Sequence, residues 1–130
     1  MTYRVVRDDV WTNIRGLNPR EKLVAIYLEA GPHSHFSGLF PCAPIDISRG
    51  TGLSERESRA TIKALNESGR VVYDPSRLLV FVPGMIERQL GTAHFNAKHQ
   101  SGIRAHLERL PKESRAVEAF FRDYGERLGC

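Results

Sequence analysis

The sequence has 130 residues, of which 41% are hydrophobic and 26% charged, and this balance is typical of one soluble globular chain rather than a disordered one. It contains no run of about 20 apolar residues that could form a membrane helix, and we expect no signal peptide. The 19 Lys and Arg against 15 Asp and Glu give a net charge of +4, which is compatible with a nucleic-acid partner. Two cysteines are too few for a disulfide framework, so both are expected to be reduced thiols.

Residues 1–17 predict a strand-like start followed by a short helix, because apolar side chains recur there at helical spacing. Trp11 is the only tryptophan, and its large ring predicts a buried anchor of the hydrophobic core. The pair Asp8-Asp9 is interpreted as a helix cap rather than as a catalytic pair of carboxylates.

The next helix is predicted over 19–30, where both ends carry clear signals. Asn18 is a good N-cap, Pro19 suits the first helical position, and Glu21 stands where a capping box needs it. Gly31 begins the loop that follows and marks the end of the helix.

Two short elements are expected next. Residues 39–41 are extended, and the prolines around them favour an edge strand. Residues 45–49 predict a short helix that ends at Gly50 and Gly52.

A second helix with a clear start follows this glycine turn. Ser54 and Glu57 form a capping box, and the helix is expected to run to about Ser68. Two short apolar runs, 71–73 and 78–82, are separated by turn-forming residues and predict a small antiparallel hairpin.

From Met85 onward the apolar pattern is helical again. The first segment is broken by Gly91, and the second has apolar residues at i, i+4 and i+7 from Ile103. A last helix is expected to start near Pro111, with an apolar stripe that includes Phe120.

This order of elements predicts an α+β fold that is mainly helical: a winged helix-turn-helix with a small β-hairpin wing and C-terminal helices. Residues 1–84 are expected to form the winged helix-turn-helix domain. Residues 85–130 are expected to form a helical extension, which either packs back on that domain or forms a dimer interface.

One face of the helix that starts after Ser54 is a candidate DNA-reading surface. At about 100° per residue, its basic side chains lie opposite its more apolar ones, so one face can pack on the core while the other points outward. An amphipathic helix with an ordinary solvated face is the alternative, and three glutamates on the same helix favour it. The candidate contacts on this helix are Ser54, Arg56, Arg59, Ala60 and Lys63.

The predicted wing supplies two further candidates. Arg77 lies at its tip and Arg70 at its base, where each could contact a DNA phosphate. A solvated turn arginine is the alternative for Arg77, and the short loop argues against deep insertion into a minor groove.

Other chemistry is weakly supported. His33, His35 and Cys42, with His94 and His99, could offer metal ligands, but their spacing does not match a structural zinc site. No nucleophile elbow, phosphate-binding loop or dinucleotide-binding fingerprint is present. We therefore expect no metal, no cofactor and no enzymatic activity.

The sequence also resembles the N-terminal winged-helix domain of phage replication proteins, often called replisome organisers. The resemblance covers about residues 3–90 and rests on Tyr3-Arg4 and Trp11, on LVAIYLEAGPHSHFSGLF, and on ISRGTGLSERESRATIKALNESGRVVYD. The stretch NAKHQSGI is similar to the region after the wing in such proteins. The resemblance implies binding to double-stranded DNA, at a phage replication origin or elsewhere, in the cytoplasm of a bacterial host and in association with the nucleoid.

Two classes of function follow from these observations. The first is a phage-type protein that binds double-stranded DNA and acts in replication initiation or transcription control, as a monomer or as a homodimer through the C-terminal helices. The second is a small phage protein that uses the same scaffold to bind and inhibit a host protein or nucleoprotein complex, such as a defence complex. Neither class involves a membrane.

Overall fold

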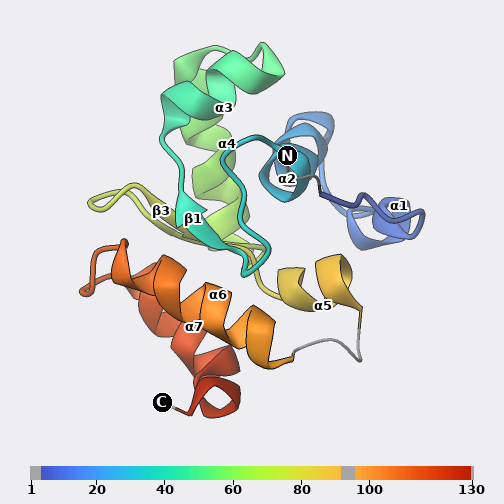
Figure 1. The fold of residues 1–130 in the computed structure, drawn as a ribbon. Helices are drawn as coiled ribbons and strands as arrows, with labels where there is room; N and C mark the ends of the chain where they lie inside the picture. Colours follow the sequence, from blue (N-terminus) through green and yellow to red (C-terminus); the bar gives the residue numbers. More distant parts are fainter. Residues whose placement is uncertain (1–3, 92–95, 130) are drawn as a thin grey trace.

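A computed structural model describes residues 4–91 and 96–129 of the chain (Figure 1). The fold is α+β, about 56% helical, with a small three-stranded antiparallel sheet. In chain order the elements are α1 (Val10–Asn13), α2 (Pro19–Ala30), β1 (Leu39–Pro41), α3 (Pro44–Thr51), α4 (Glu55–Glu67), β2 (Val72–Asp74), β3 (Leu79–Phe81), α5 (Met85–Leu90), α6 (Ala97–Glu108), α7 (Arg115–Tyr124) and a final 3-10 turn, η1 (Glu126–Leu128).

The sheet has the order β1-β3-β2, so β3 is its central strand. Val80 of β3 lies opposite Phe40 of β1 and Tyr73 of β2, which sets the register on both sides. The predicted hairpin and the predicted edge position of 39–41 are confirmed by this pairing.

Helices cover both faces of the sheet. Figure 1 shows α2, α3 and α4 on one side of it and α6 and α7 on the other. Because successive side chains of a strand point to opposite faces, each strand contributes to two separate cores. The first core joins the sheet to α2, α3 and α4 and includes Val24, Leu28, Phe40, Ile47, Ile62, Leu65 and Val80. The second core joins it to α5, α6 and α7 and includes Leu39, Leu79, Phe81, Ile103, Phe120 and Tyr124.

The helical segment after the sheet therefore packs back onto it. Phe81 meets Phe120 edge-on, with ring centroids 5.8 Å apart, and Tyr124 packs beside both rings. The Tyr124 hydroxyl also donates to the Glu87 carboxylate of α5 at 2.5 Å. These contacts fix α7 against the sheet.

Most predicted helix boundaries agree with the structure. Helix α2 spans the predicted residues and has the full capping box between Asn18 and Glu21. Helix α4 starts at the predicted box between Ser54 and Glu57. Helix α3 is longer than predicted, because the backbone stays helical through Gly50 and turns only at Gly52, which adopts a φ of +83°.

Three expectations near the chain ends are wrong. Trp11 is 68% exposed and is not a core anchor, because α1 is a short helix at the surface with no buried residue. Within residues 4–9 no strand forms. The interpretation of Asp8-Asp9 as a helix cap, in contrast, is confirmed in position, because Asp9 is the N-cap residue of α1, although its side chain makes no capping hydrogen bond. The last helix begins at Arg115 rather than near Pro111, since Ser114 supplies its N-cap.

Gly50 marks a close approach between α2 and α3. The Tyr27 hydroxyl of α2 donates to the backbone carbonyl of Asp46 at 3.0 Å, which lays the tyrosine ring along α3. A Cβ atom added at Gly50 would lie 2.1 Å from Cε1 of that ring. Any larger residue must therefore displace Tyr27.

We predict that Gly50→Ala destabilises the protein by about 1–3 kcal/mol through this overlap. Gly102→Ala is the matched control, because Gly102 also lies within a helix and nothing stands within 4 Å of its added Cβ. The control should stabilise the protein by up to about 1 kcal/mol from helix propensity alone. Urea unfolding of both variants checks the pair, and equal effects at the two positions would contradict the packing argument.

Two histidines stack between the loop before β1 and helix α6. The rings of His35 and His106 are 3.6 Å apart and nearly parallel. Nδ1 of His35 accepts from the backbone N–H of Ser37, and Nε2 of His106 lies 2.6 Å from the carbonyl of Leu39. Burial, the facing His106 and the nearby Arg4 lower the pKa of His35 to about 3. Burial also lowers the pKa of His106, with a smaller contribution from Arg109 and an opposing one from the Leu39 carbonyl.

We predict that stability falls as the pH is lowered from about 6.5 toward 3. In that window the unfolded chain binds a proton at His35 that the folded chain excludes, so acid favours unfolding. His35→Asn keeps an acceptor for Ser37 and removes the titration, so its free energy of unfolding should change less between pH 7.5 and 5 than that of the wild type. A wild-type pH dependence of the free energy of unfolding in His35→Asn would refute the assignment.

Candidate nucleic-acid interface

The predicted division of α4 into two faces is confirmed. Its inner side chains, Ser58, Thr61, Ile62 and Leu65, are buried. Ile62 and Leu65 belong to the first core, and the hydroxyls of Ser58 and Thr61 donate to backbone carbonyls of the preceding turn. Its outer side chains are exposed: Arg56, Arg59, Ala60 and Lys63. We call these four residues, with Ser54 at the helix start, the α4 face.

The glutamates of α4 have specific partners. Glu55 pairs with Arg59 at 3.1 Å, and Glu57 pairs with Arg20 of α2 at 2.6 Å. The backbone N–H of Ser54 and the Arg20 guanidinium lower the pKa of the Glu57 carboxyl. Glu57 is thus held toward α2. The Glu55–Arg59 pair is exposed, and such pairs contribute only about 0.3–0.5 kcal/mol, so Arg59 can exchange its partner at little cost.

Two cations of the α4 face have no ion-pair partner in the described part of the chain. Within residues 4–91 and 96–129, neither Arg56 nor Lys63 forms an ion pair. The Ser54 side chain already has a partner, because its hydroxyl oxygen caps the helix by accepting a hydrogen bond from the backbone N–H of Glu57. The face therefore presents its positive charge from the first turn of the helix onward, at Arg56, Arg59 and Lys63, and the Ser54 cap fixes where the helix begins.

The β2–β3 turn is held in one conformation by Asp74. Its carboxylate accepts hydrogen bonds from the backbone N–H groups of Ser76 and Arg77 and from the Ser76 hydroxyl, at 2.7–3.3 Å. Burial alone would raise the pKa of the Asp74 carboxyl, but these hydrogen bonds and one from Ser114 lower it to about 2. The turn also contains Leu78 at a φ of +52°, a backbone region that disfavours leucine.

The two predicted wing arginines lie in different surroundings. Nε of Arg77 donates to the carbonyl of Glu113 at 3.1 Å, in the loop between α6 and α7. Arg70 donates to the carbonyl of Asn13 and so joins the end of α4 to the end of α1. The structure therefore places Arg70 beside α1 and Arg77 beside the start of α7.

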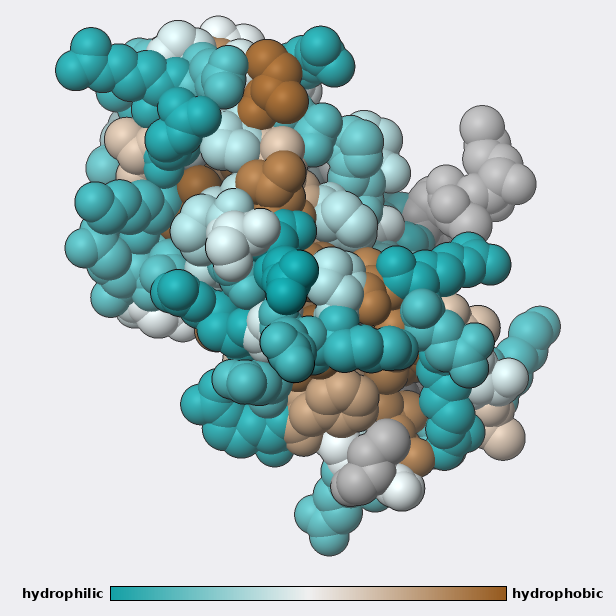
Figure 2. All heavy atoms as spheres, turned by 90° about the vertical axis from the view of Figure 1, so that its left-hand side faces the viewer, coloured by the Kyte–Doolittle hydropathy of each residue, from teal (hydrophilic) through white to brown (hydrophobic). Residues whose placement is uncertain are grey.

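A groove of about 360 Å³ lies beside the α4 face, between α4, β2 and the start of α7. Arg59 and Lys63 line it from α4, and Arg115 lines it from α7. The remaining lining residues are Ile62, Asn66, Glu67, Tyr73 and Pro75. We call this the β2 groove. Figure 2 shows the side of the molecule to which the hairpin turn points in Figure 1; hydrophilic side chains cover most of it, with hydrophobic ones in smaller areas between them.

Arg115 is a member of this site that sequence reasoning missed. Ser114 could have marked it as the first residue of a helix, because serine is a common N-cap. No local signal, however, places the start of α7 beside α4, because that proximity depends on how α7 packs on the sheet.

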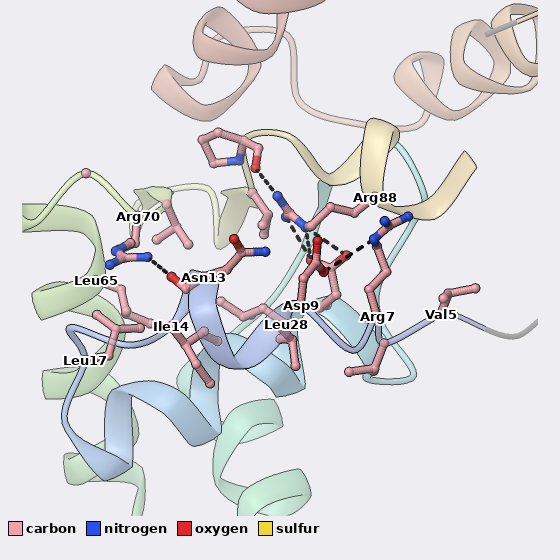
Figure 3. Close-up of a pocket in the computed structure, with 18 residues that line it drawn as sticks. Val5, Arg7, Asp9, Asn13, Ile14, Leu17, Leu28, Leu65, Arg70 and Arg88 are labelled. Atoms are coloured by element: carbon pink, nitrogen blue, oxygen red, sulfur yellow. Dashed lines mark hydrogen bonds and ion pairs between the residues drawn. The ribbon is translucent and has the colours of Figure 1, made fainter. Parts of the chain in front are cut away.

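A second hollow, of about 310 Å³, lies between the N-terminal segment and the first core (Figure 3). Its wall includes Glu29, which is only 8% exposed and accepts from Arg88 at 2.9 Å and from Gln89 at 2.7 Å. Arg70 and Asn13 meet at another part of the wall (Figure 3). Its buried charges are paired, and the exposed α4 cations do not line it.

Among the described residues, no group of three or more His, Cys, Asp or Glu side chains could hold a metal ion. Burial raises the pKa of the Cys42 thiol to about 12, so this cysteine is an unreactive core residue. His94 and Cys130 lie outside the described residues. Within the same limits, none of the helices has the length and apolar character needed to cross a membrane.

Comparisons with known proteins give no assignment. No family model matches the sequence, and neither a curated protein nor a solved structure matches the chain. The interpretation of the site therefore rests on its own geometry.

We predict that Asp74→Ala lowers the free energy of unfolding by about 1–3 kcal/mol, because the donors of Ser76, Arg77 and Ser114 lose their shared acceptor. Asp8→Ala removes an exposed carboxylate at the surface and should change stability by less than about 0.5 kcal/mol. Thermal unfolding at pH 7 compares the two. Equal losses would show that the turn does not depend on the Asp74 carboxylate.

Proposed function

We propose that the chain folds as a winged helix-turn-helix and binds double-stranded DNA. The order α2, β1, α3, α4, β2, β3 and the strand order β1-β3-β2 support this interpretation. Helices α3 and α4 then form the helix-turn-helix, with Gly52 in the turn between them. The β2–β3 hairpin is the wing, and α4 is the recognition helix.

The observation that carries the proposal is the exposed cationic α4 face. Helix α4 has 13 residues and is therefore about 20 Å long, enough to lie in a major groove about 12 Å wide. Arg56, Arg59 and Lys63 can donate to phosphates or to guanine edges, and Ala60 offers a small apolar surface beside them. Arg77 lies in the turn that would approach the flanking backbone, whereas Arg70 must release the Asn13 carbonyl to do so.

The biological setting that we propose is the one that the resemblance to phage replication proteins implies. The proposal is a phage-type protein that acts in replication initiation or transcription control, in the bacterial cytoplasm near the nucleoid, without a cofactor. A homodimer would add a second half-site. Since Phe120 and Tyr124 are buried in the second core, a dimer through the C-terminal helices would have to use their outer side chains.

A second candidate function is binding to a host protein or nucleoprotein complex. Trp11 favours it, because an exposed tryptophan is a common anchor of protein interfaces and this one is 68% exposed. In that case the partner would cover α1 rather than the α4 face.

We predict that the protein binds random duplex DNA in a fluorescence-anisotropy titration, more weakly at higher salt. The variant Arg56→Ala/Arg59→Ala/Lys63→Ala should lose most of the affinity and reduce the salt slope by about 2 to 3, because each phosphate contact contributes about 0.9.

The matched control removes the same charge from the opposite layer. Lys98→Ala/Arg109→Ala/Arg122→Ala takes three exposed cations from α6, α7 and the loop between them. It should retain wild-type affinity within about twofold. If both variants lose affinity to a similar extent, the loss reflects net charge and not the α4 face. If the folded wild type does not bind duplex DNA at low salt, the DNA-binding proposal fails and the protein-binding candidate is favoured.

A further inference from the structure

The hairpin turn and the start of α7 are joined into one structural unit. Arg77 donates to the carbonyl of Glu113, and Ser114 hydrogen-bonds to the Asp74 carboxylate. The same Ser114 hydroxyl oxygen accepts from the N–H of Ala116, which caps α7. The wing turn therefore fixes the position at which α7 begins.

These hydrogen bonds between the hairpin turn and the start of α7 place Arg115 at the β2 groove. Arg115 is exposed and lines the groove together with Arg59 and Lys63 of α4, with Tyr73 and Pro75 of the hairpin between the two helices. Three cationic side chains from two helices thus surround one groove, and Glu67 is the one acidic residue in its lining. Arg59 is paired with Glu55, but that pair is exposed and weak, so an anion bound at the groove can interact with all three cations.

We propose that Arg115 contacts a DNA phosphate, so that the C-terminal helical segment forms part of the DNA surface as well as covering the sheet. This inference rests on the proposed DNA binding by the α4 face. An arginine suits the role because its planar guanidinium can donate two parallel hydrogen bonds to one phosphate. The N-terminal end of α7 adds a partial positive charge beside it.

The β2 groove follows the outer edge of the sheet, next to the recognition helix. A DNA backbone that leaves the major groove at Arg59 and Lys63 would pass the hairpin turn and reach Arg115. Since the turn is already bonded to α7, this extended surface exists before DNA arrives, and binding does not need to order it.

The test uses the full chain and three variants in the same duplex titration. Arg115→Gln should weaken binding about threefold to tenfold and reduce the salt slope by about 0.9, the contribution of one phosphate contact. Arg115→Lys keeps the positive charge, so its salt slope should equal that of the wild type. Its affinity should lie between those of the wild type and Arg115→Gln, because lysine lacks the planar guanidinium. Arg122→Gln removes an exposed arginine near the other end of α7 and should leave both quantities unchanged. Thermal unfolding of the variants checks that the fold is retained.

The outcomes separate this inference from the function on which it rests. If the wild type and the α4 variant differ as predicted but Arg115→Gln binds like the wild type, the role of Arg115 is overturned and DNA binding stands. Equal weakening by Arg115→Gln and Arg122→Gln also overturns it, since only net charge would matter. If the wild type does not bind duplex DNA at low salt, both proposals fail.

Discussion

The molecule depends on burying both faces of one three-residue strand. Val80 of β3 points into the first core, whereas Leu79 and Phe81 on either side of it point into the second. All three are at most 1% exposed, so β3 receives apolar partners from α2–α4 above and α5–α7 below. A sheet this short has few hydrogen bonds of its own, and the two helical layers supply most of the burial that stabilises it. This arrangement fixes the distance between α4 and α7, and with it the shape of the β2 groove.

The sequence predicted those parts of the fold whose causes are local. Asn18 and Ser54 cap their helices through residues three positions away, so both helix starts could be found by inspection. The two faces of α4 followed from helical periodicity, and the hairpin from the turn chemistry around Asp74. Each of these signals is complete within a few residues, and no knowledge of the rest of the chain is needed to interpret it.

The sequence was misleading where a residue's surroundings come from distant segments. An isolated tryptophan usually indicates a core, yet Trp11 belongs to a helix too short and too peripheral to bury it. Arg70 stands at the base of the hairpin in sequence, but its guanidinium reaches back to Asn13, and Arg115 comes beside α4 only through the packing of α7. The surroundings of Arg70 and Arg115 therefore depend on tertiary contacts that periodicity and capping do not encode.

The two-sided sheet also has a consequence for how the chain is made. The strands and the first-core helices precede α6 and α7 in the sequence, so the first core can form while the ribosome is still adding the helices of the second. During that interval Leu39, Leu79 and Phe81 lie on an uncovered apolar sheet face. Exposed faces of this kind recruit chaperones and promote association between nascent chains. Where the first core forms before α6 and α7 are complete, the side chains that later join the two layers are exposed to association with other chains.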